Sequence, residues 1–258
     1  MSTKGVWLED LTWPEAKARF AAGRPVVVPV GAIAKEHGFH LPLKTDYVTA
    51  RGLGQLLADR LDVVVAPVVP FGFYPAFVGY PGSQHLEAST FISLMEELIG
   101  NLLDHAVDRI VIVNTGVSTE SPLNIVLSNV YRRRAVRIFC AHMRLLGRGA
   151  DHLLRDRSGG HGDERETSIM LALDARSVRM DRLQPGGDRH EPGSPRDLLA
   201  RSYRLGEANP GSDEYTATGA LGDPSAAEAY KGERILAAMI DELEQAIRAA
   251  FPQAFPRN

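Results

Sequence analysis

Residues 26–46 read VVVPVGAIAKEHGFHLPLKTD, and this stretch decides both the fold and the candidate site. Its first five residues are apolar, and a short apolar run of this kind predicts a buried strand. Residues 36–46 then place one Glu, two His and one Asp in eleven positions. Carboxylate and imidazole groups bind divalent metals such as Zn²⁺ and Mn²⁺, and α/β enzymes carry their chemistry on loops that follow strands. The stretch therefore indicates either a metal-dependent active site or a polar loop whose His residues only cap backbone groups.

The composition is typical of a soluble globular enzyme. The chain has 258 residues, of which 44% are hydrophobic and 24% charged, and we expect residues 1–258 to form a single α/β domain. The net charge of −3 gives no basic excess for nucleic-acid binding, and we interpret Arg132–Arg134 as a solvated cluster. Cys140 lies in an apolar run and is expected to be a buried core residue rather than a nucleophile.

The sequence contains no signal-peptide pattern at its N-terminus. No apolar run approaches the roughly 20 residues that are needed to span a bilayer. We therefore expect a cytoplasmic protein that has neither a membrane nor a nucleic acid as its partner.

Strands and helices are predicted to alternate along the first half of the chain. The apolar runs predict strands at 26–30, 63–69, 110–114 and 135–141. Helical periodicity and capping residues predict helices from Thr12 onward and at 47–61, 91–106, 121–134, 164–173 and 224–251. This order predicts an α/β fold, with a mainly parallel sheet flanked by helices on both faces and the carboxyl ends of the strands at one edge. The segment from Pro185 to Asp213 is either a long surface loop or partly mobile.

Three further segments hold candidate site residues. His161 stands between two glycines, which let a ligand approach the backbone closely, although the acidic residues after it could simply stabilise a helix N-terminus. Residues 114–122 follow a predicted strand and open a helix, so their N–H groups could hold an oxyanion. Ser118 in that segment lacks the G-x-S-x-G elbow of a nucleophile, and a Ser or Thr of the segment could simply cap the helix. The aromatic loop at 71–81, which includes Tyr74, could form the wall of a pocket or pack as a surface loop.

Taken in order, these segments resemble the creatininase family of metal-dependent amidohydrolases. The first motif of the family reads P-V-G-(S/T)-x-E-x-H-G-x-H-L-P-x-x-T-D, and residues 29–31 and 37–46 match it. Residues 114–119 stand where the family has N-G-H-G-G-N, and residues 161–168 where it has H-A-G-E-x-E-T-S. Residues 222–233 resemble its late G-D-P-x-x-A-x-x-x-G pattern. The resemblance implies a three-layer fold, a homo-oligomer (a hexamer in the family) and the hydrolysis of small amides.

The resemblance also implies a set of metal ligands, from which this chain departs at the first motif. In the family, the Glu, His and Asp of that motif bind metal, and the Asp bridges two ions. His37 and Asp46 keep two of these positions, but Lys35 stands at the Glu position when the residues are counted back from His37. Glu36 is adjacent to His37, and it would reach the same metal only if the backbone bulges.

A second departure lies in the segment after the third strand. The His of the family's N-G-H is replaced by Gly116, and its neighbours Thr115 and Ser118 are poor metal ligands. The late carboxylate, Glu166, is retained. The metal pair implied by the resemblance has therefore lost one ligand, and another is displaced.

Three hypotheses follow from these departures. The first is a metal-dependent amidohydrolase with a reduced site that holds one Zn²⁺ or Mn²⁺, or Fe²⁺, per subunit and cleaves a small amide or cyclic amide. The second is a metal-free enzyme in which Lys35 supplies the positive charge. The third is a non-catalytic relative that binds a ligand in the same pocket or stabilises an assembly. For the first we expect metal ligands at His37, Asp46, Glu166 and Glu36, catalytic residues at His161, His40 and Lys35, and substrate contacts at Tyr74, Ser118 and Thr115.

Overall fold

The computed structural model describes residues 4–156, 160–186 and 218–255. A five-stranded parallel sheet has the strand order β1-β3-β2-β4-β5. Its strands are β1 (Val6–Trp7), β2 (Val26–Val30), β3 (Val64–Val65), β4 (Ile110–Asn114) and β5 (Phe139–His142). The α-helices are α1 (Trp13–Ala21), α2 (Thr45–Arg60), α3 (Ala88–Asp104), α4 (Glu120–Arg134), α5 (Glu164–Asp174) and α6 (Ala229–Ala250).

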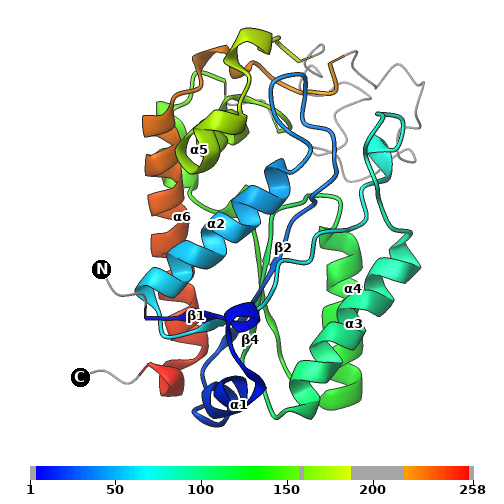
Figure 1. Ribbon diagram of the computed structural model, residues 1–258, viewed down its shortest axis with the longest axis vertical. Helices are drawn as coiled ribbons and strands as arrows, with labels where there is room; N and C mark the ends of the chain where they lie inside the picture. Colours follow the sequence, from blue (N-terminus) through cyan, green and yellow to red (C-terminus); the bar gives the residue numbers. More distant parts are fainter. Residues whose placement is uncertain (1–3, 157–159, 187–217, 256–258) are drawn as a thin grey trace.

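Helices cover both faces of the sheet and form a three-layer arrangement (Figure 1). Helices α2, α5 and α6 lie on one face, and α3 and α4 lie on the other. Alternate strand residues supply the two cores, because successive side chains of a strand point to opposite faces. Val27 and Val111 belong to the core beneath α2 and α6, whereas Val28 and Ile112 belong to the core beneath α3 and α4. The predicted fold class is confirmed.

Most of the predicted elements are found close to their expected bounds. Strands β2 and β4 begin and end at the predicted residues, and α1 carries the capping box in which Glu15 accepts a hydrogen bond from the Thr12 backbone N–H at 2.7 Å. The edge strand β1 was not predicted, since two residues are too few to form a pattern. The segment from Pro185 to Asp213 lies, apart from its first two residues, outside the described residues.

Three predicted bounds were wrong, each for a local reason. The second strand pairs continuously only at Val64–Val65, and Pro67 has no N–H to continue the ladder. The strand expected from residue 135 begins at Phe139, because Ala135 ends α4 in the left-handed conformation, with φ +56°. The last helix begins at Ala229 and not at residue 224, because Ala227 is extended and separates a short 3₁₀ turn from α6.

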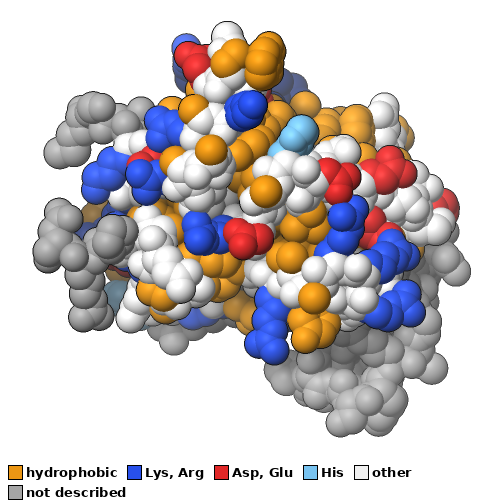
Figure 2. Space-filling view, turned by 90° about the horizontal axis from the view of Figure 1, so that it is seen from below, with side chains coloured by type: hydrophobic (Ala, Val, Ile, Leu, Met, Phe, Trp, Pro, Cys, Tyr) orange, Lys and Arg blue, Asp and Glu red, His pale blue; other side chains and the backbone are white. Residues whose placement is uncertain are grey.

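The surface agrees with the low net charge. At the end of the molecule opposite the carboxyl ends of the strands, acidic and basic side chains are interspersed (Figure 2). Arg19 and Arg24 there both pair with Asp62, at 2.7 and 3.0 Å. Among the described residues, none of the helices is both long and apolar enough to cross a membrane.

The contact between α5 and α6 depends on a glycine. Gly232 of α6 is buried against the carbonyl oxygen of Ser168 in α5, and an added Cβ would collide with that oxygen. Because the obstacle is backbone and not a flexible side chain, the two helices would have to separate. Helix α5 also carries Glu166, so this contact positions part of the candidate site.

Replacing Gly232 by Ala should lower the free energy of unfolding by roughly 1–3 kcal/mol, the usual cost of overpacking a core. The matched control is Gly100→Ala in α3, where an added Cβ meets nothing within 4 Å and the gain in helix propensity should leave stability unchanged or slightly higher. Urea unfolding of both variants checks this. Equal stability of the two variants would contradict the packing role of Gly232.

Candidate active site

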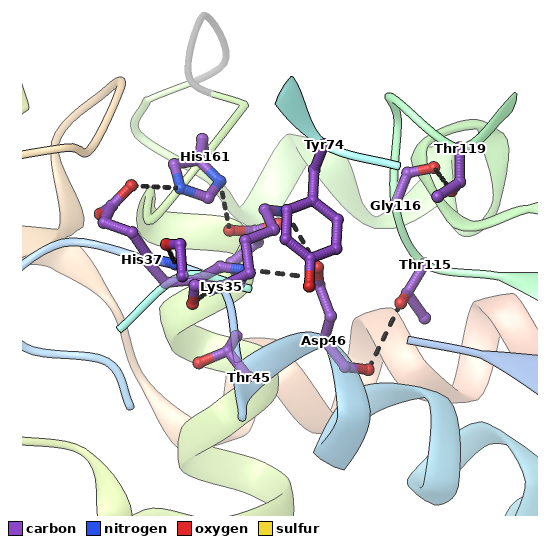
Figure 3. A network of polar contacts seen from close by, with 12 residues as sticks. Lys35, His37, Thr45, Asp46, Tyr74, Thr115, Gly116, Thr119 and His161 are labelled. Carbon is purple, nitrogen blue, oxygen red and sulfur yellow. Dashed lines mark hydrogen bonds and ion pairs between the residues drawn. The ribbon is translucent and has the colours of Figure 1, made fainter. Parts of the chain in front are cut away.

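The candidate site lies at the carboxyl ends of β2 and β4, where the loop after β2 meets α2 and α5 (Figure 3). The loop supplies Lys35, Glu36 and His37. Asp46 lies in the first turn of α2, and His161 precedes α5. Parallel strands bring their carboxyl ends to one edge, which is why segments distant in sequence meet here.

A buried ion pair joins Lys35 to Asp46. The Lys35 Nζ atom lies 2.8 Å from Asp46 Oδ2, and the two residues are 7% and 2% exposed. The other carboxylate oxygen, Oδ1, lies 3.1 Å from His37 Nε2. The ammonium also stands 4.8 Å from the centre of the Phe77 ring, within the range of a cation–π contact. Both oxygens of Asp46 therefore face nitrogen atoms.

The hydrogen bonds of His37 fix its tautomer. Its Nδ1 atom lies 2.9 Å from the carbonyl oxygen of Lys35, which can only accept, so Nδ1 carries a proton. In the neutral ring, Nε2 would then present a lone pair to Asp46 Oδ1. Two acceptors 3.1 Å apart repel each other unless a cation lies between them or His37 takes a second proton.

The pKa values of these groups reflect the same charges. Burial alone would raise the pKa of Asp46, but the charges of Lys35 and His37 outweigh that effect and hold it well below its usual range. Burial alone would lower the pKa of His37, but the charge and hydrogen bond of Asp46 together with the charge of Glu166 outweigh burial, and the pKa is raised. The pKa of His161 is lowered, chiefly by burial, so its neutral form is favoured.

On the other side of His37, Glu36 and His161 form a second pair. Glu36 Oε2 lies 3.1 Å from His161 Nε2, and the rings of His37 and His161 are 4.6 Å apart. Lys35 and Glu36 thus point to opposite sides of the loop, as adjacent residues of an extended segment do. Gly38, with φ +81°, turns the chain so that its N–H donates to the Glu36 carboxylate.

Glu166 completes a group of possible metal ligands. One ligand atom each of His37, His161 and Glu166 lies within 4.8 Å of the others. Glu166 Oε2 accepts a hydrogen bond from Gly162 N at 2.7 Å and lies 3.9 Å from His161 Nδ1. Asp163, the N-cap of α5, accepts from the Glu166 N–H at 2.9 Å and fixes this turn.

The remaining predicted residues take different positions. His40 is buried beside α5, with Nε2 2.8 Å from Thr167 Oγ1, and is not part of the ligand group. The Thr115 hydroxyl donates to the carbonyls of Val30 and Asp46, at 3.0 and 3.3 Å, and so ties β4 to β2 and α2.

Tyr74 and Ser118 line a small cavity together with Lys35, Asp46 and Gly116. The cavity volume is about 10 Å³, which admits one water molecule. The Tyr74 hydroxyl donates to the backbone carbonyl of Gln84, and burial, with the charge of Asp46, raises its pKa to about 12.

Two features of the site were not singled out from the sequence. Phe77 lies against both Lys35 and His161, at 4.8 and 4.5 Å from its ring centre. The Asn114 side chain donates to the Gly116 carbonyl and accepts from Thr119, both at 2.6 Å, and holds the turn after β4. Phe77 falls in the aromatic loop, but nothing in the spacing of that loop indicates which ring faces the site.

Known proteins resemble this chain over nearly its whole length. The family described as "Creatininase: Creatinine amidohydrolase" matches residues 9–247. A creatinine amidohydrolase of Pseudomonas putida is 30% identical over 118 residues, which cover 43% of this chain and 45% of that protein. A mycofactocin precursor peptide peptidase of Mycolicibacterium smegmatis is 30% identical over 226 residues, covering 84% of this chain and 81% of that protein.

Solved structures agree with this match. A creatinine amidohydrolase (creatininase) crystal structure superposes with a TM-score of 0.84 at 25% identity, covering 97% of this chain and 99% of that one. A mutant creatininase of the Zn-Zn type also gives 0.84, at 24% identity, covering 98% and 100%. With a family match over most of its length and the same fold, the chain belongs to the creatininase family.

Proposed function

We propose that this protein is a metal-dependent amidohydrolase that cleaves a C–N bond of a small amide or cyclic amide and uses one divalent metal ion per subunit. The observation that carries the proposal is the convergence of His37, His161 and Glu166 at one buried point at the edge of the sheet. Membership of the creatininase family supports the reaction class.

The hydrogen bonds of both histidines support their role as ligands. A metal-binding His usually gives its other ring N–H to a carbonyl or a carboxylate. His37 has Nδ1 against the Lys35 carbonyl, and His161 has Nε2 against the Glu36 carboxylate, at 2.9 and 3.1 Å. The other two nitrogens each face a carboxylate oxygen, His37 Nε2 that of Asp46 at 3.1 Å and His161 Nδ1 that of Glu166 at 3.9 Å. A metal ion would bind both nitrogens on this side. Glu36 and Asp46 would lie beside the ligands His161 and His37 and contact their rings. His161 would then be a metal ligand and not a proton carrier.

The charge of the site also supports a single divalent ion. The carboxylates of Glu36, Asp46 and Glu166 carry three negative charges and the Lys35 ammonium one positive charge. With both imidazoles neutral, as metal ligands must be, the formal charge is two negative. Two imidazoles and carboxylates suit Zn²⁺, Mn²⁺ or Fe²⁺. When bound, such an ion would polarise an amide carbonyl and lower the pKa of a coordinated water.

Chemistry that the relatives share supports this substrate class. The names of two relatives, creatinine amidohydrolase and mycofactocin precursor peptide peptidase, both indicate hydrolysis of an amide bond. The cavity lined by Lys35, Tyr74 and Ser118 admits a group no larger than a water molecule, so it would receive the carbonyl oxygen of the substrate and not the whole molecule. The Lys35 ammonium would donate a hydrogen bond to the carbonyl oxygen, and Phe77 would keep water from the ammonium.

Protein purified without chelator should contain about one equivalent of Zn²⁺, Mn²⁺ or Fe²⁺ per chain. Elemental analysis measures this, and removal of the metal should abolish hydrolysis of small amides while supplementation restores it. A chain that binds no metal after supplementation with all three ions would contradict the proposal and favour a metal-free or non-catalytic relative.

Changing His161 to Gln should weaken metal binding by more than 100-fold. Glu36→Gln removes only the negative charge beside His161, so it should weaken metal binding by about 10–100-fold. His152→Gln, at an exposed position, is the matched control and should bind as the unmodified protein does. Calorimetric titration of the metal-free proteins measures these affinities. If the His161 variant kept full affinity but lost activity, His161 would be a proton carrier instead.

A further inference from the structure

We propose that the Lys35 ammonium permanently occupies the place of a second metal ion, so that the site combines one exchangeable metal with one fixed cation. A structural relative is described as a Zn-Zn type, which implies two ions in that protein. The present chain does not fit two. The single metal rests on the function proposed above, but the place of Lys35 does not depend on it.

The first observation is that each oxygen of Asp46 already faces a nitrogen atom. Its Oδ2 atom is held by Lys35 at 2.8 Å, and its Oδ1 atom faces His37 at 3.1 Å. Lys35 is almost completely buried, and burying an ammonium is costly unless it is paired. The carboxylate and the Phe77 ring together provide that pairing. A metal at Oδ2 would have to displace a paired, buried ammonium.

The second observation concerns the opposite wall of the cavity. Lys35 and Asp46 share the cavity with Gly116, Ser118 and Thr119. Among the described residues that line it, Asp46 is the only carboxylate and none is a His. Hydroxyl and amide groups are weak ligands for Zn²⁺. The side of Asp46 that faces Lys35 therefore offers one strong ligand, which is too few for a second ion.

The third observation is the charge balance. One divalent ion neutralises the two negative formal charges that remain after Lys35 has been counted. A second divalent ion would leave two uncompensated positive charges in a buried site, which is strongly unfavourable. Lys35 thus fixes the metal count at one.

The decisive variant is Lys35→Glu combined with Gly116→His, which exchanges the ammonium for a carboxylate and adds an imidazole across the cavity. A Cβ at position 116 would meet the Thr119 hydroxyl at 2.9 Å, and a side-chain rotation of Thr119 can relieve this contact. The metal content of the unmodified protein, both single variants and the double variant is measured by native mass spectrometry after saturation with Zn²⁺.

The double variant should bind one more Zn²⁺ ion than the unmodified protein. Gly116→His alone should bind the same number of ions as the unmodified protein, because Lys35 is still in place. A folded double variant with an unchanged metal count would overturn the proposal, as would two ions in the unmodified protein. If the unmodified protein binds no ion and the double variant binds one, the function proposed above fails while the role of Lys35 stands.

If the double variant does not fold, a second variant tests the proposal. Lys35→Met keeps the stem but removes the charge, so the Asp46 carboxylate loses its buried partner. Its melting temperature without metal should fall, and added Mn²⁺ should raise it by more than it raises that of the unmodified protein. Lys17→Met, at an exposed position of α1, is the control and should respond as the unmodified protein does. A response of Lys35→Met to Mn²⁺ no larger than the control's would overturn the proposal.

Discussion

The ion pair between Lys35 and Asp46 is the interaction on which the organisation of the site depends. It is almost fully buried, so it acts in a medium of low dielectric constant, where an unpaired charge is much more costly than in water. Asp46 also faces His37, and its backbone carbonyl accepts from Thr115 of the neighbouring strand segment. The loop after β2, helix α2 and the end of β4 are thus held together at one carboxylate.

The fold brings these parts together in a way that local sequence alone does not. Parallel strands end at one edge, which places the β2 loop beside the turn after β4. The close packing of α5 on α6 at Gly232 sets the position of Glu166, and a short N-terminal turn with Asp163 as its cap orients that side chain. Catalytic groups drawn from the ends of several elements are typical of α/β enzymes.

The core elements could be predicted from the sequence, because buried parallel strands are continuous apolar runs and helices repeat every 3.6 residues. Residues 26–30 and 110–114 are clear examples of such strands. The partners in the site could not be predicted in the same way, since residues 31–44 form a loop with no period. The sequence identified Lys35 and Glu36 as the unusual positions, but not that Lys35 pairs with Asp46 while Glu36 turns to His161. Those pairings depend on the turn at Gly38 and on the segment before α5, where His161 lies 125 positions after Glu36 in the sequence.

Anomalous diffraction from crystals saturated with Zn²⁺ distinguishes a site with one metal and one fixed cation from a site with two metals. We expect one zinc peak per chain, bound by His37, His161 and Glu166, with Lys35 still within hydrogen-bonding distance of Asp46. Two zinc peaks on either side of Asp46, with the Lys35 side chain displaced, would contradict this expectation.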